Sequence, residues 1–252
     1  MSTYLPKKVI AQLVAGTFSV VLGAQAMAAT THSTVSSKTH EVKQVPQSLE
    51  MLSRDNTVLV LVDHQIGLFT GVRDIPVADL KHNVVALAKA AKVLGIPVIM
   101  TATMPDGLWG PTIPELTSAL PDVPIITRTV INAWDDPAVR AAIEKTGRKQ
   151  ILIAGVSLEV CAAFPAIAAK AAGFDTRVVL DASGTFNDAK REAGIQRLTV
   201  AGIPLTDYAS AGVELLGSNT DPKAHNVYNA LDIPFATLVW QLKNTPQPDN
   251  QK

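Results

Sequence analysis

The sequence predicts an α/β fold in which one parallel sheet carries helices on both faces. Six short aliphatic runs alternate with segments of helical periodicity. Such strand–helix–strand alternation gives right-handed crossovers and a parallel sheet. The runs are apolar at consecutive positions, which is typical of strands that are buried on both faces. The predicted strands are residues 57–62, 97–103, 123–127, 151–154, 176–180 and 202–206.

Helices are predicted between the first four strands. Apolar residues recur every three or four positions over residues 80–94, which indicates an amphipathic helix. Shorter helices fit residues 114–120 and 137–145. The aspartates at 135 and 136 precede a proline, so they are expected to cap the second of these helices rather than bind a metal.

The fourth strand leads into the stretch around which the domain is organised. Residues 151–154 are followed by Gly155, which gives the backbone freedom to turn, and then by a helical pattern that contains Cys161. Pro165 lacks a backbone donor, so we expect a bend after the first turn or a helix that starts late.

The remaining elements follow this stretch. Pro204 marks the sixth predicted strand as an edge strand. Later helices are predicted from Asn187 or Asp188 to 201, over 210–216, and over 222–242 with a break at Pro234.

The amino terminus is predicted to be an export signal. Lys7 and Lys8 precede a short apolar run, and Ala26-Met27-Ala28 is a small-x-small cleavage pattern. The apolar run is short for a membrane span, so an uncleaved anchor is the weaker interpretation. We therefore expect a signal peptide over 1–28, a flexible leader over 29–50, one domain over 51–243 and a disordered tail over 244–252. Localisation would then be periplasmic or secreted.

Composition and motifs exclude several classes of function. The 252 residues carry 22 basic and 22 acidic side chains, so the formal net charge is zero and nothing favours nucleic acid or an anionic membrane as a partner. There is no Gly-x-Gly-x-x-Gly after a strand and no Walker A sequence, so nucleotide cofactors lack support. The scattered histidines form no His-Glu-x-x-His grouping. We expect a small-molecule substrate, no cofactor and no metal.

Cys161 is the single cysteine, and its position favours chemistry. Free amides and the positive end of a helix dipole stabilise a thiolate, which is the nucleophilic form. The same amides can hold the negative oxygen that develops when a carbonyl or nitrile carbon is attacked. Two alternatives remain at this point. Cys161 is either a small buried hydrophobic residue or a target of oxidation.

Asp63 and His64 follow the first strand, at the edge of the sheet where active-site clefts form. Alternation along the strand sends their side chains to opposite faces, so only one of them meets Cys161 easily. If Asp63 faces the cleft, it is a general base or acid. If His64 does, the site is a Cys–His dyad. Otherwise Asp63 caps the following segment and His64 packs behind the strand.

Other candidates follow the second and third strands. Arg128 could hold a carboxylate or a substrate oxygen, but its pKa is too high for proton exchange near neutrality. Alternatively, it is an ordinary surface arginine. Trp109, Asn132 and Trp134 are predicted to line a substrate pocket, although a tryptophan that covers the core is at least as common.

Three motifs resemble those of the isochorismatase-like cysteine hydrolases. They are Val62-Asp63-His64-Gln65-x-x-x-Phe69, Arg128-x-x-x-Asn132-Ala133-Trp134 and Gly155-Val156-Ser157-x-x-Val160-Cys161. The phrases Asn-Ala-Trp-Asp, Ala-Phe-Pro-Ala and Asp-Ala-Ser-Gly-Thr-Phe-Asn look closest to the YcaC-type branch of that family. The resemblance runs from about residue 55 to residue 211, with the motifs in the family's order.

The resemblance implies a six-stranded parallel sheet, a homo-oligomer that is octameric in the YcaC type, and an Asp-Lys-Cys site. By this resemblance Asp63 takes the thiol proton and returns it to the leaving group, while Cys161 forms a covalent intermediate. A cis peptide is implied at Val156–Ser157. The backbone amides of Ser157 and Cys161 would then form the oxyanion hole.

Two departures from the family pattern bear on activity. Arg128 stands where the family has lysine, and arginine cannot act as an acid. The metal-binding residues of nicotinamidase members have no counterpart around residues 104–111. We therefore expect a metal-free cysteine hydrolase that acts on a small amide, carbamate or nitrile-like C–N bond. The alternative is a non-catalytic oligomeric scaffold or binding protein that retains the fold.

Overall fold

The computed structural model describes residues 50–244 and confirms the predicted fold class. Residues 1–49 and 245–252, which hold the predicted signal and nearly all of the predicted leader and tail, lie outside the described residues. All strand pairings in the sheet are parallel, and the six strands lie in the order β3-β2-β1-β4-β5-β6. Their bounds are β1 Thr57–Val62, β2 Val98–Thr103, β3 Ile125–Arg128, β4 Gln150–Gly155, β5 Asp175–Val179 and β6 Leu205–Thr206.

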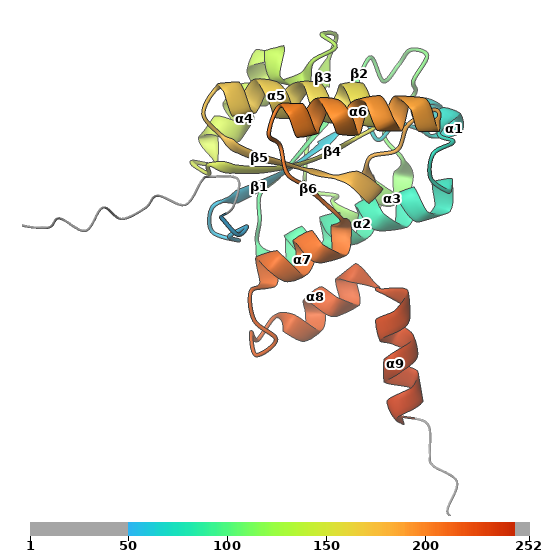
Figure 1. Cartoon of the computed structure of the whole chain (residues 1–252), viewed down its shortest axis with the longest axis vertical. Helices are drawn as coiled ribbons and strands as arrows, with labels where there is room; N and C mark the ends of the chain where they lie inside the picture. The colour runs from blue at the N-terminus through green and yellow to red at the C-terminus, as the bar shows by residue number, and fades with distance from the viewer. Residues whose placement is uncertain (1–49, 245–252) are drawn as a thin grey trace, which may run out of the picture. The chain divides into compact units, whose positions relative to one another are not determined.

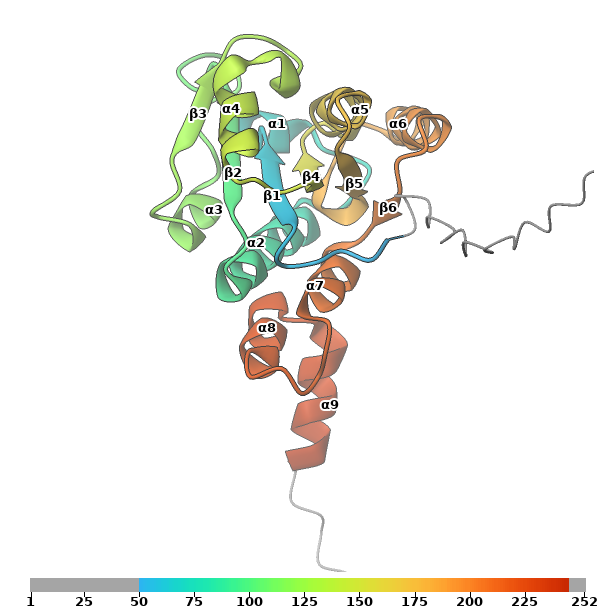
Figure 2. The same ribbon diagram turned by 90° about the vertical axis from the view of Figure 1, so that its left-hand side faces the viewer.

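Helices cover both faces of the sheet, and each layer encloses its own core (Figure 1, Figure 2). On one face lie α2 and α7, with α3 and α8 packed against α2; α4, α5 and α6 lie on the other face. The bounds are α1 Ile66–Gly71, α2 Val77–Leu94, α3 Pro114–Ala119, α4 Pro137–Lys145, α5 Ala163–Ala171, α6 Asp188–Val200, α7 Tyr208–Leu216, α8 Ala224–Leu231 and α9 Pro234–Asn244.

The strand order places a topological switch point between β1 and β4. The chain builds β2 and β3 on one side of β1, then returns to build β4, β5 and β6 on the other side. Val62 and Gly155 are paired in register at the carboxyl ends of the two central strands. In open α/β sheets ligands bind outside the carboxyl ends of the strands at such a point.

The elements β3, β6 and α1 differ most from the sequence prediction. β3 begins at Ile125 and β6 is only Leu205–Thr206, because Pro124 and Pro204 cannot donate a ladder hydrogen bond. The helix α1 was not predicted, since its six residues are too few to show a helical period and include two glycines. The predicted edge position of β6 is confirmed.

Cys161 lies in a π-helical turn, Leu158–Ala162, which precedes α5. The N–H of Ala162 donates to the carbonyl oxygen of Ser157, five residues earlier. Pro165 is the third residue of α5, where a missing N–H is tolerated, so the late start predicted for this helix is confirmed. Short π-helical turns of this kind are frequent at functional sites.

The last helix, α9, presents apolar side chains to solvent. Phe235, Leu238, Val239 and Leu242 are 55–69% exposed and recur at helical spacing on one stripe. Within residues 50–244, no helix combines the length and hydropathy needed to cross a membrane.

The turn that carries Cys161 packs directly on Gly155. A Cβ built on Gly155 would lie 2.9 Å from the backbone carbonyl carbon of Cys161 and 3.0 Å from the backbone nitrogen of Ala162. Backbone atoms cannot yield as the end of a flexible side chain does, so only glycine fits here.

Gly155→Ala is expected to lower the free energy of unfolding by about 1–3 kcal/mol, because the added methyl forces the turn away from the strand. Chemical denaturation measures this change. The displaced turn should also alter the rate at which iodoacetamide alkylates Cys161. A variant with an unchanged denaturation midpoint and an unchanged alkylation rate would contradict the close contact.

Candidate active site

Asp63 leaves β1 in a strained backbone conformation that turns its side chain into the site. Its φ is 56°, in the left-handed region that non-glycine residues seldom occupy. Its backbone N–H donates to the carbonyl oxygen of Thr101 on β2 at 2.9 Å, and the residue is 1% exposed. Oδ2 accepts a hydrogen bond from Arg128. Oδ1 has no regular hydrogen-bond partner among the described residues.

Arg128 reaches Asp63 from the end of β3, across the intervening β2. Thr103 on β2 and Arg128 are paired in register, so the long guanidinium side chain spans one strand to meet the carboxylate. Its Nη1 donates to the carbonyl oxygens of Val130 and Ile131, the latter at 2.9 Å, and its Nε lacks a partner in the described part of the chain. The side chain is fully buried, so the interpretation as a surface arginine is wrong.

Cys161 lies beside this ion pair, and its thiol holds its proton tightly. Burial raises the pKa of Cys161 well above its ordinary value, and the adjacent negative charge of Asp63 raises it further. The positive charge of Arg128 opposes both effects. The sequence argument for a stabilised thiolate did not include burial or the neighbouring carboxylate, and both of these raise the pKa of Cys161.

Asp63 is the proton acceptor nearest the thiol. Burial raises the pKa of Asp63 above 3.8, while the charge of Arg128 and hydrogen bonds with Cys161 and Arg128 pull it back. The pKa of the Cys161 thiol is raised more strongly than that of the Asp63 carboxyl. Before any reaction the proton therefore stays on the sulfur. The Asp63 carboxylate is therefore adjacent to a protonated thiol.

His64 points away from the thiol. Its Nε2 donates to the carbonyl oxygen of Ala182 at 3.0 Å, and its ring packs 6.2 Å from that of Phe69. Complete burial lowers the pKa of His64 to about 4, so the ring is neutral. The Cys–His dyad alternative is thus wrong, and the opposite orientations of Asp63 and His64 are confirmed.

A cavity of about 340 Å³ brings most of the candidate residues together. Asp63, Arg128, Ser157 and Cys161 line it beside the predicted pocket residue Trp109. Five further lining residues were not predicted: Leu68, Thr103, Ile131, Val160 and Phe186.

Two predicted pocket residues lie elsewhere. Trp134 is 7% exposed and packs edge-on against Phe174 in the core on the α4 and α5 side of the sheet. Asn132 uses its side-chain oxygen to accept from the backbone N–H of Trp134, which caps the short turn Ala133–Asp135. Both are therefore structural residues, and the neighbouring Ile131 is the one that reaches the cavity.

The expected oxyanion-hole amides differ in their availability. The peptide bond between Val156 and Ser157 is cis, as predicted. The N–H of Ser157 has no acceptor among the described residues, whereas the N–H of Cys161 donates to the carbonyl oxygen of Ser157 at 2.7 Å. Of these two amides, only that of Ser157 is without an acceptor among the described residues, and the oxyanion hole formed by both stays a prediction.

Gln65 anchors the loop that carries Trp109. Its Nε2 donates to the carbonyl oxygens of Thr103 at 3.0 Å and Gly110 at 2.6 Å, while its Oε1 accepts from the N–H of Thr103. The N–H of Gly67 donates to the carbonyl oxygen of Trp109 at 2.8 Å. The position of Gln65 directly after Asp63 and His64 was the available sequence signal, but its role depends on contacts distant in sequence.

Phe186 is held in the cavity wall by its neighbours. The Thr185 hydroxyl donates to Glu159 at 2.6 Å, and the Thr185 N–H donates to Asp74 at the same distance. Asp74 in turn pairs with Arg191 at 2.7 Å. These contacts tie the loop after β5 to the turn that carries Cys161.

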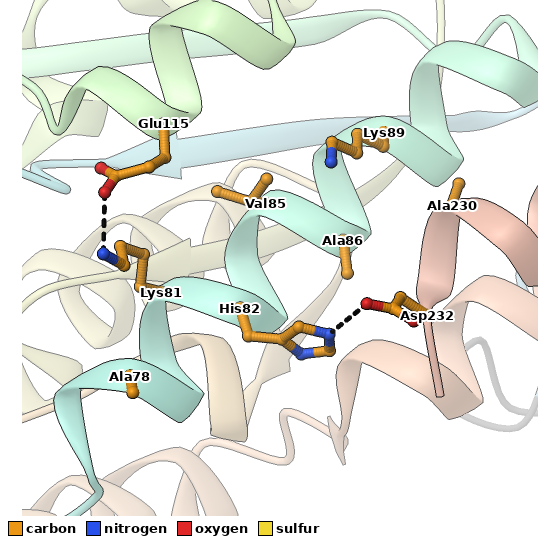
Figure 3. A pocket seen from close by; sticks show the side chains of 9 residues that line it. All are labelled: Ala78, Lys81, His82, Val85, Ala86, Lys89, Glu115, Ala230 and Asp232. Carbon is orange, nitrogen blue, oxygen red and sulfur yellow. Dashed lines mark hydrogen bonds and ion pairs between the residues drawn. The ribbon is translucent and has the colours of Figure 1, made fainter. Parts of the chain in front are cut away.

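A second hollow lies on the exposed side of α2, between Glu115 and Asp232 (Figure 3). Lys81 pairs with Glu115 at 2.7 Å, and His82 lies 3.6 Å from Asp232. No thiol lines it, and its charged groups are largely engaged with one another. Within residues 50–244, no group of three or more His, Cys, Asp or Glu side chains is placed to hold a metal ion.

Residues 57–210 match the isochorismatase domain family. The chain belongs to the isochorismatase family. It is 46% identical over 165 residues to the probable hydrolase YcaC of Escherichia coli. The matched region covers 65% of this chain and 79% of YcaC.

Solved structures agree with this assignment. YcaC from Pseudomonas aeruginosa, with hexane-2,5-diol and covalent acrylamide, is 39% identical, with a TM-score of 0.73 over 77% of this chain and 98% of that one. YcaC from E. coli, described as an octameric hydrolase of unknown specificity, is 38% identical, with a TM-score of 0.72 over 77% and 96% of the two chains. The protein is thus an isochorismatase-family hydrolase of the YcaC type.

Asp63→Asn is expected to make Cys161 easier to deprotonate. The substitution removes the negative charge that raises the thiol pKa and leaves the positive charge of Arg128, which lowers it. Alkylation by iodoacetamide should then reach half its maximal rate at a lower pH, and should be roughly tenfold faster at pH 7 for each unit by which the pKa falls.

Asp181→Asn is the matched control, because Asp181 is a partly buried carboxylate whose Oδ1 accepts from the Tyr208 N–H rather than meeting the thiol. Its alkylation profile should equal that of the unmodified protein. An unchanged or upward-shifted midpoint in Asp63→Asn would show that the carboxylate does not act on the sulfur.

Proposed function

We propose that this protein is a cysteine hydrolase that cleaves a C–N bond in a small amide, carbamate or nitrile-like substrate. The observation that carries this proposal is the convergence of Cys161, Asp63 and Arg128 on one cavity at the switch point of the sheet. The nucleophile is the thiol rather than a metal-activated water, and no cofactor takes part.

The reaction with an amide proceeds through a covalent thioester. Sulfur attacks the carbonyl carbon, the S–H proton passes to Asp63, and the carbonyl electrons move to oxygen. Collapse of this intermediate breaks the C–N bond, and the nitrogen leaves with the proton from Asp63. Water then attacks the thioester, Asp63 accepts its proton, and the sulfur recovers that proton as the acid is released.

Proton transfer within the pair keeps the charge balanced. Asp63 becomes neutral as the substrate oxygen becomes negative, so the attack step does not place two anions beside Arg128. General base catalysis of this type contributes about 10²–10⁴-fold to the rate. The free N–H of Ser157 can donate to the oxyanion, and removing one such donor typically reduces kcat by about 10²–10³-fold.

Arg128 acts as a fixed positive charge and not as an acid. Its guanidinium remains protonated throughout, so the proton that the leaving nitrogen needs comes from Asp63. Its carbonyl contacts at residues 130 and 131 hold the charge in place.

The second candidate function is a non-catalytic scaffold that retains the fold. The raised pKa of the Cys161 thiol favours it, because a protonated thiol is a weak nucleophile.

Acrylamide provides a direct test, because the P. aeruginosa YcaC structure contains covalent acrylamide. Intact-mass analysis is expected to show one adduct, which peptide mapping places on Cys161. Cys161→Ala should form no adduct and should lose all hydrolysis of amides that the unmodified protein cleaves in an ammonia-release screen. Asp63→Asn should retain an adduct but lose about 10²–10⁴-fold in kcat. Full turnover by Cys161→Ala would remove the proposal.

We also propose that the chain is exported to the periplasm or beyond. Support comes from the basic residues, apolar run and small-x-small pattern of residues 1–28. A lone cysteine has no partner for an internal disulfide, so it can remain a thiol in an oxidising compartment.

A homo-oligomer completes the proposal, and the octamer of E. coli YcaC supports it. The exposed apolar stripe of α9 is its contact surface, because apolar residues gathered on one face mark association sites.

Replacing Leu238 and Leu242 together by lysine should lower the native mass measured by light scattering, since both side chains are exposed and the fold does not need them. Val200→Lys is the matched control, because Val200 is 90% exposed but lies on α6 outside the stripe. An unchanged native mass of the double variant would exclude α9 from the contact.

A further inference from the structure

The cavity around Cys161 contains one balanced ion pair and a largely apolar wall. Among the described residues that line it, Asp63 and Arg128 carry the charges, and they pair with each other. The remaining wall is formed mainly by Leu68, Trp109, Ile131, Val160 and Phe186.

Arg128 is poorly placed to receive a substrate anion. Its Nη1 donates to two backbone carbonyl oxygens and its Nη2 donates to Asp63. A carboxylate or phosphate brought beside it would also meet the negative charge of Asp63. Burying an ion without a counter-charge is unfavourable, so the cavity disfavours an anionic substrate.

A cationic substrate meets the reverse problem. The negative charge of Asp63 is already balanced by Arg128, and an ammonium group in this cavity would lie near the guanidinium. No second carboxylate lines the cavity among residues 50–244. The site therefore disfavours ions of either sign.

Size and shape further restrict the ligand. The volume of about 340 Å³ accommodates on the order of ten non-hydrogen atoms, at about 30 Å³ for each water-sized group. Gln65 and Gly67 fix the backbone of the Trp109 loop, so this wall is formed in advance. A preformed apolar wall favours an aliphatic or single-ring group over a polar chain.

We propose that the substrate is an uncharged amide or nitrile that carries a short aliphatic or single-ring aromatic group. This inference rests on the hydrolase function proposed above and adds the charge and polarity of its substrate. The neutral amide or nitrile carbon meets the thiol, and the apolar group occupies the wall beside Trp109 and Phe186.

Three acrylamide probes of similar size test the inference on the intact protein. N-propylacrylamide is neutral, N-(2-aminoethyl)acrylamide is cationic and N-acryloylglycine is anionic. Each adds the Cys161 sulfur to its terminal alkene carbon, and the thiol proton goes to the neighbouring carbon, so nothing leaves. The adduct on Cys161 is followed by mass, and each rate is divided by the rate of that probe with glutathione at the same pH.

The neutral probe is expected to react at least tenfold faster than either ion after this correction. Ile131→Lys adds a positive charge to the wall at a side chain that is 69% exposed, so the fold should persist. This variant should raise the relative rate of the anionic probe several-fold. Ile131→Met, which adds no charge, should leave the order of the three probes unchanged.

The possible failures are distinguishable. Equal corrected rates for the three probes overturn the inference even if neutral amides are hydrolysed, in which case the hydrolase function stands. A neutral preference without hydrolysis of any amide or nitrile supports the cavity preference and removes the proposed reaction. Failure of every probe to label Cys161 overturns both.

Discussion

The buried ion pair between Asp63 and Arg128 is the constraint on which the site depends. It joins the end of β1 to the end of β3 across β2, with both side chains withdrawn from water. Removing one member of such a pair leaves an uncompensated charge and costs about 3–5 kcal/mol. The same guanidinium holds the carbonyl groups of residues 130 and 131, so it fixes the backbone that places Ile131 in the cavity wall.

The ion pair also decides where the thiol proton resides. Burial alone makes a thiolate unfavourable at Cys161, and the negative charge of Asp63 makes it more so. Arg128 reduces this effect without reversing it, which leaves a neutral thiol next to an ionised acceptor. In the proposed reaction, hydrolysis therefore depends on proton transfer to Asp63 as the sulfur attacks, and a low resting pKa of the thiol is not required.

Residues at strand ends were predictable from the sequence, because parallel strands place their carboxyl ends on one edge. This argument placed Asp63 or His64 at the cleft and left Arg128 open, whereas the grouping of Asp63, Arg128 and Cys161 came from the resemblance to the isochorismatase-like hydrolases. Asn132 and Trp134 failed because the turn Ala133–Asp135 sends the chain back into the core within a few residues of Arg128. The thiol pKa and the role of Gln65 depend on burial and on contacts far apart in sequence, which local patterns do not contain.

A cavity that excludes ions has a consequence for turnover. In the proposed reaction, hydrolysis of a neutral amide creates a carboxylic acid, which ionises and then lies beside Asp63 without a free counter-charge. Asp63 must itself be ionised again before the next cycle, so the two negative charges repel each other across the same small space. The balanced pair that admits the neutral substrate thus disfavours its product. In the proposed reaction, the charge that hydrolysis produces would therefore promote product release.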